Sequence, residues 1–201
     1  IQHYFLSSSF SQSIGLVYGR IPDVIFEKKV IPAWVLAKPL VDFMKYEHWG
    51  SEESGAHYSL FMEVFSALKV TLEDLYQATP LQSTSNFVTF RRRLCAKGSI
   101  LSAVGGLGFM ELALEKIYRK YLDGAKNIAN KENISISFGY FKAHIREEKA
   151  DYEKFKGILL NLERGQEDNS FFQIRRGAID LLNARDRWYS KLDSHFFGEE
   201  K

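Results

Sequence analysis

Three potential metal ligands lie close together in the segment FKAHIREEKADYEKF. His144, Glu148 and Asp151 are spaced i, i+4 and i+7, so in a helix their side chains fall on one stripe. Phe141 and Phe155 extend that stripe at both ends. Imidazole and carboxylate groups on one helical face could bind a metal ion. An ordinary charged helix surface is the alternative, and ligands from other helices must decide between them.

Three further candidates lie in other, more apolar segments. Glu47 precedes a predicted helix break at Gly50, where an acid is unfavourable because of the helix dipole. His57 lies on the apolar side of its segment, where a hydrogen-bonded core histidine is the common alternative. Glu111 lies in GGLGFMELALEKIY, and a carboxylate so framed is costly to bury unless it is paired or metal-bound. A surface position is the alternative for Glu111.

The apolar pattern that must position these residues predicts helices almost throughout. Apolar residues recur at helical intervals in six ranges, namely 32–49, 51–70, 71–78, 83–122, 134–163 and 169–197. The range 83–122 is too long for one regular helix, and we expect two halves joined or kinked around Gly105, Gly106 and Gly108. These glycines could also let another helix or a ligand approach closely. Residues 1–31 give the least clear pattern.

The sequence therefore predicts an all-α protein with six or seven helices in a single domain over residues 1–201. Its 201 residues are 45% hydrophobic and 14% aromatic, which indicates a globular chain with an aromatic core. The formal net charge of +2 favours neither nucleic acid nor an anionic membrane, and no apolar run is long enough to span a membrane. Cys95 is the single cysteine, which excludes an internal disulfide and fits a reducing cytoplasm. The chain begins at Ile1, which leaves open a preceding segment, including one for targeting.

Helical bundles build dimetal carboxylate sites from acids and histidines on separate helices. Three stretches of this sequence resemble the haem-oxygenase-like diiron oxidases and oxygenases. YEHWGSEESGAHYSLFMEVFSAL resembles that family's first ligand pair, a Glu followed ten residues later by a His, and assigns Glu47 and His57. GGLGFMELALEKIY resembles its glycine-rich approach to a single Glu and assigns Glu111. YFKAHIREEKADYEKF resembles its last ligand helix and assigns His144 and Glu148.

The sequence departs from the family pattern at two ligand positions. Asp151 stands where a histidine is usual, and Glu148 replaces the commoner Asp. Both substitutes can bind iron, but one imidazole fewer favours oxygen-only ligation at one ion, which is then held less tightly or is manganese. On the predicted ligand helix we expect Glu147 and Lys154 on the solvated side. The resemblance covers roughly residues 30–190.

The resemblance implies a haem-oxygenase-like helical bundle that acts as a non-haem diiron oxidase or oxygenase. Such proteins use two Fe ions, with Mn an option at one site, and O2 as co-substrate to oxidise a small molecule. Amino acids, amines and fatty acids are the substrate types that it suggests, in a setting such as natural-product biosynthesis. An external electron donor and a homodimer are further options, whereas neither nucleic acid nor a membrane is expected as a partner.

Other function classes stay open on the sequence. The same helical fold could serve as a metal-poor or metal-free binding or partner protein. A thiaminase-like hydrolase would need a cysteine nucleophile, for which Cys95 is the only candidate. Haem oxygenase proper would need a proximal histidine near the N-terminus, for which His3 is the candidate. Five arginines could pair with a substrate carboxylate or simply be solvated, namely Arg91, Arg92, Arg93, Arg176 and Arg185.

Overall fold

The computed structural model describes residues 1–21, 33–49, 55–163 and 170–198. The described residues form nine α-helices and no β-strand, which confirms the predicted all-α class. The helices are α1 (Gln2–Ser8), α2 (Phe10–Tyr18), α4 (Ala33–Trp49), α5 (His57–Ala67), α6 (Leu72–Gln77), α7 (Gln82–Lys97), α8 (Ile100–Glu132), α9 (Gly139–Glu163) and α10 (Ser170–Phe197). None of the helices in these ranges is long and apolar enough to cross a membrane.

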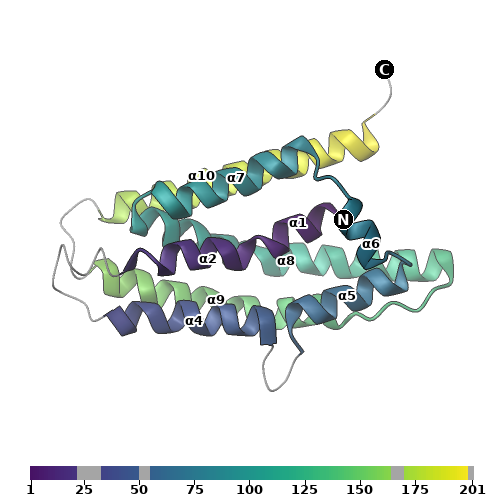
Figure 1. Ribbon diagram of the computed structural model, residues 1–201, viewed down its shortest axis with the longest axis horizontal. Helices are drawn as coiled ribbons and strands as arrows, with labels where there is room; N and C mark the ends of the chain where they lie inside the picture. The colour runs from purple at the N-terminus through teal and green to yellow at the C-terminus, as the bar shows by residue number, and fades with distance from the viewer. Residues whose placement is uncertain (22–32, 50–54, 164–169, 199–201) are drawn as a thin grey trace.

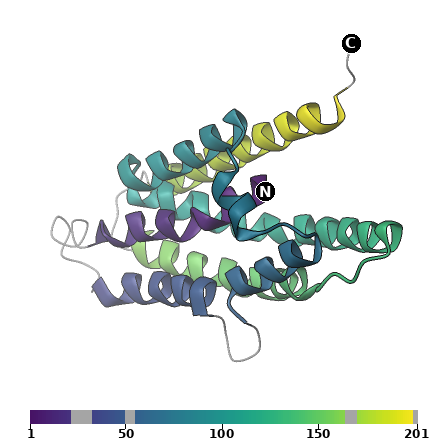
Figure 2. The same cartoon turned by 45° about the vertical axis from the view of Figure 1, so that its right-hand side comes forward.

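The long helices lie side by side in an elongated bundle (Figure 1). α8 packs against both α9 and α10, and α7 lies along α10 on one side of the bundle. α4 lies along α9 on the opposite side. α2 contacts α7, α4 and α8, so the N-terminal helices run through the middle of the bundle, as the rotated view also shows (Figure 2). The helices α1 and α2, from the segment with the least clear sequence pattern, therefore contribute to the interior.

Local sequence signals account for several helix ends. α6 begins with a capping box in which the Thr71 hydroxyl accepts from the Asp74 amide and the Asp74 carboxylate accepts from the Thr71 amide. α5 begins later than predicted, at His57, because Ala56 has extended backbone angles. Ser51 and Glu52, read as the start of this helix, lie outside the described residues. α9 likewise begins at Gly139 instead of residue 134.

The predicted helix over 83–122 does divide, but not at the glycine cluster. α7 ends at Lys97, and α8 then runs unbroken to Glu132. The break coincides with Gly98 and with Ser99, whose hydroxyl caps α8 by accepting a hydrogen bond from the Ser102 amide at 3.1 Å. The expectation that two helices join at Gly105, Gly106 and Gly108 is therefore wrong.

The glycines of α8 instead bring its backbone close to both neighbouring helices. A Cβ atom on Gly105 would lie 2.6 Å from the Ile174 carbonyl oxygen of α10. A Cβ atom on Gly108 would lie 2.6 Å from the Cβ of Phe155 on α9. The close approach of another helix, one of the two uses expected for these glycines, is the one that the structure has.

Gly177 on α10 gives a test of this packing. A Cβ there would overlap the backbone of Ser102, so Gly177→Ala should destabilise the fold by about 3 kcal/mol. Gly124→Ala is the matched control, because nothing lies within 4 Å of that position on α8. There the helix propensity of Ala should raise stability by about 0.5–1 kcal/mol. Urea unfolding followed by circular dichroism measures both, and equal effects would contradict close α8–α10 packing.

Candidate functional site

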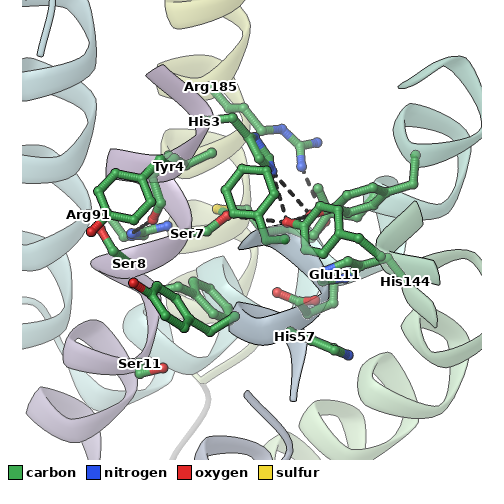
Figure 3. A pocket seen from close by; sticks show the side chains of 18 of the residues that line it. His3, Tyr4, Ser7, Ser8, Ser11, His57, Arg91, Glu111, His144 and Arg185 are labelled. Carbon is green, nitrogen blue, oxygen red and sulfur yellow. Dashed lines mark hydrogen bonds between the residues drawn. The ribbon is translucent and has the colours of Figure 1, made fainter. Parts of the chain in front are cut away.

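A cavity of about 80 Å³ lies within the bundle and is lined by residues from both ends of the chain (Figure 3). Three predicted metal ligands line it: His57 from α5, Glu111 from α8 and His144 from α9. All three are buried, with at most 8% of each residue exposed. The volume has room for on the order of six water-sized groups. The structure thus brings together half of the predicted ligand set.

The two imidazoles of this set lie against one another. The ring centroids of His57 and His144 are 4.3 Å apart. The Tyr118 ring stacks on the His144 ring, with centroids 4.1 Å apart and an interplanar angle of 1°. Tyr140 meets His144 edge-on at 4.7 Å. These contacts fix the plane of the His144 ring beside the cavity.

Glu111 is placed by the same helical stripe as Tyr118. Glu111, Leu114 and Tyr118 follow at i, i+3 and i+7 on α8, and all three line the cavity. Only 3% of Glu111 is exposed, so its carboxylate lies in the interior, as the apolar frame of its segment suggested. In Figure 3 it lies on the same side of the cavity as His57 and away from Arg185.

Of the three remaining predicted ligands, the structure describes only the side chain of Asp151. Asp151 is buried but does not line the cavity, and its carboxylate accepts a hydrogen bond from Lys154 Nζ at 2.6 Å. The side chains of Glu47 and Glu148 lie outside what the structure describes. Among the described side chains, no group of three or more His, Cys, Asp or Glu is arranged closely enough to hold a metal ion.

Glu147 and Lys154, expected on the solvated side of α9, are instead engaged with the predicted ligands. His57 Nε2 donates to Glu147 Oε2 at 2.9 Å, and the Glu147 side chain is only 20% exposed. Lys154 pairs with Asp151 and lies 6.0 Å from the Phe43 ring centroid. The prediction was wrong because i+3 neighbours on a helix lie almost as close to one face as i+4 neighbours.

His3 is a cavity residue that the sequence analysis did not place. Its Nε2 lies 3.1 Å from the Tyr140 hydroxyl and 3.4 Å from that of Tyr118, and these two hydroxyls are 3.0 Å apart. Its Nδ1 is buried without a hydrogen-bond partner. A sequence signal was present, because Leu6, Phe10, Ile14 and Val17 recur at helical intervals, and all four are buried.

The five candidate arginines separate into two classes. Arg92, Arg93 and Arg176 are exposed, as the ordinary reading expected. Arg91 and Arg185 are buried and line the cavity. Arg91 donates to the Leu6 carbonyl at 2.8 Å, and Arg185 donates to the Met110 carbonyl at 3.2 Å. Two guanidinium groups therefore stand in the cavity wall, held there by backbone oxygens.

No protein-family model matches this chain, and no curated protein matches it either. The function therefore has to be argued from the geometry and chemistry of the cavity.

The pH dependence of stability should report on His3. Burial, followed by the charges of His144, the N-terminus and Arg91, lowers the pKa of His3 from 6.5 to about 3. Between these values only the unfolded chain binds the proton, so stability falls as the pH falls from 6.5 towards 3. The loss is up to about 1.4 kcal/mol per pH unit. In urea titrations His3→Phe should flatten this slope, whereas His195→Phe, at an exposed site, should leave it unchanged. Parallel slopes for wild type and His3→Phe would contradict a neutral buried His3.

The reactivity of Cys95 should show whether it can be a nucleophile. Cys95 is fully buried and does not line the cavity, and burial raises the pKa of its thiol to about 12. Thiolate is therefore scarce near neutral pH. We expect iodoacetamide at pH 8 to leave the folded protein unlabelled and to add one label in urea, as measured by mass spectrometry. Rapid labelling of the folded protein would revive the cysteine-hydrolase reading.

Proposed function

We propose that this chain is a haem-oxygenase-like non-haem iron oxidoreductase that uses O2 to oxidise a small substrate in the buried cavity. The observation that carries the proposal is that His57, Glu111 and His144 come from three different helices to line one cavity. The resemblance assigns all three positions from the sequence alone. A charged helix surface would not place them together in the interior.

The donor types in the cavity suit a metal ion of this kind, and because the described side chains are not grouped closely enough to hold one, binding would have to draw them together. Two imidazoles and one carboxylate suit iron or manganese, and a cation would offset the cost of burying the Glu111 carboxylate. His57 donates its Nε2–H to Glu147 Oε2, so Nδ1 is the ring nitrogen whose lone pair would bind the ion. Asp151 is not part of this donor set, since it does not line the cavity and pairs with Lys154. A second ion would depend on Glu47 and Glu148.

The chain's own residues would position the metal and substrate. Bound iron would supply the reduction of O2 and the oxidising equivalents. Tyr118 and Tyr140 hold the His144 ring in one orientation beside the cavity. The hydroxyls of these tyrosines connect the His144 side of the cavity to His3 by hydrogen bonds, which is a route along which a proton can be shared.

Iron binding tests the proposal. After anaerobic incubation with Fe(II) and desalting, elemental analysis should find one or two Fe ions per chain. His57→Ala, Glu111→Gln and His144→Ala should each weaken Fe(II) binding at least about ten-fold, because each removes a donor atom. His195→Ala and Glu115→Gln are matched controls, since His195 is exposed and Glu115 pairs with Arg119 on the surface.

The response to O2 completes this test. The Fe(II) protein should consume O2 and show a transient visible absorption that the three ligand variants lack. A folded wild-type protein that binds no iron above background would overturn the proposal and favour a metal-free binding protein of the same fold. Equal iron binding by wild type and all three ligand variants would place the metal elsewhere.

A further inference from the structure

His57 depends on contacts outside its own helix for the orientation of its ring. It is the first residue of α5, and the preceding Ala56 forms no side-chain cap there. His144, in contrast, lies within α9, and its ring is held by the Tyr118 stack and the Tyr140 edge. A contact from another helix can therefore decide how the His57 ring lies.

Glu147 on α9 supplies such a contact. The His57 Nε2 atom lies 2.9 Å from Glu147 Oε2. An ionised carboxylate only accepts hydrogen bonds, so the imidazole proton in this pair lies on Nε2. His57 lines the cavity and Glu147 does not. With Nε2 directed at Glu147, the other ring nitrogen, Nδ1, is the one that can face the cavity.

The Glu147 carboxylate is held in turn by its neighbour Arg146. The Arg146 Nη2 atom donates to Glu147 Oε1 at 2.8 Å, so the two carboxylate oxygens serve two different donors. The exposed fraction of the side chains falls along this chain, from 50% for Arg146 through 20% for Glu147 to 5% for His57. Charge-assisted hydrogen bonds are strong ones, and partial exclusion of water strengthens them further. The chain thus links the protein surface to the cavity wall.

The helix that provides this carboxylate also provides the second imidazole of the site. Glu147 follows His144 by three residues on α9, which is a neighbouring position on a helix. The centroid of the His57 ring lies 4.3 Å from that of His144. The His57 ring is therefore contacted by α9 at two points, one against its face and one at Nε2, and these restrict both its position and its rotation.

We propose that Glu147, held by Arg146, is a positioning residue that fixes the tautomer and the orientation of His57. With the proton kept on Nε2, a metal ion would bind through the lone pair of Nδ1. A carboxylate on the outer nitrogen of a ligating histidine raises the basicity of the ligand and supports metal affinity. The role of His57 as a ligand rests on the proposed function, whereas the fixed tautomer is a property of the metal-free protein.

The tautomer of His57 tests this role without a metal. The metal-free, full-length protein, labelled with nitrogen-15 in its histidine rings, is examined at about pH 9, where imidazoles are ordinarily neutral. The His57 signals, assigned by their loss in His57→Ala, should show a protonated Nε2 and an unprotonated Nδ1. Glu147→Leu should give signals averaged over both tautomers, whereas Glu147→Gln should keep the wild-type tautomer because its amide oxygen still accepts from Nε2. Glu153→Leu is the matched control and should leave the signals unchanged, since Glu153 pairs with Lys156 on the surface of the same helix.

Fe(II) binding measures the consequence of this orientation. Glu147→Leu should weaken Fe(II) binding about ten-fold or more, and Glu147→Gln should weaken it less, because only the former lacks an acceptor for Nε2. Glu153→Leu should bind Fe(II) as the wild type does. Equal losses in Glu147→Leu and Glu147→Gln would make the carboxylate itself a ligand and would overturn the positioning role.

The wild-type protein keeps the test decisive if Glu147→Leu does not fold. A His57 proton on Nδ1 in the wild type would overturn the inference, as would an unchanged tautomer in a folded Glu147→Leu protein. The expected tautomer together with no iron binding above background would contradict only the proposed function. Normal iron binding with the His57 proton on Nδ1 would contradict only this inference.

Discussion

The close contact of α8 with α9 and α10 is the constraint on which the site depends. Glycines at 105, 108 and 177 remove the side chains that would otherwise hold these helices apart. Glu111 lies one turn beyond Gly108 on α8, so the contact that brings α9 close also brings the stripe from Glu111 to Tyr118 next to the α9 face that bears His144. The same α8 backbone accepts a hydrogen bond from α10, at the Met110 carbonyl. The close packing of these helices determines which side chains meet at the site. Two helices separated by ordinary side chains would leave room for water between these groups.

The contrast between His144 and Asp151 shows that a helical stripe predicts burial but not which side chains share a cavity. Both lie on one stripe of α9, as predicted, and both are buried. Seven residues are about two turns, or roughly 10 Å along the axis, so side chains on one stripe need not reach one cavity. The position of the cavity along α9 depends on the other helices that line it. This tertiary packing cannot be derived from the pattern of α9 alone. The burial of Glu111 and His57 was predictable because a polar residue on the apolar face of a helix usually points to the interior.

The buried arginine of the run Arg91–Arg93 could have been chosen from the sequence alone. Successive residues in a helix point about 100° apart, so one of three adjacent arginines faces the core. Phe87 and Cys95 lie four residues to either side of Arg91, and all three are buried. The helical spacing therefore indicated that Arg91 is the buried arginine. Charged side chains are rarely buried, however, so a solvated position was expected. The partners of Arg91 could not be predicted, because the Leu6 carbonyl and the Ser9 hydroxyl come from the N-terminal helices, more than 80 positions away.

The N-terminal helix α1 adds a further imidazole to the cavity. α5, α8 and α9 supply His57, Glu111 and His144. α1 brings His3 to the cavity, and its imidazole stays neutral because burial and the positive charges of Arg91 and the N-terminus all disfavour the protonated form. A neutral ring can share a proton with the Tyr140 hydroxyl on one side and offer an N–H on the other, which a protonated or exposed histidine could not do in the same way. The segment with the weakest sequence pattern thus supplies the imidazole that joins the tyrosine pair beside His144.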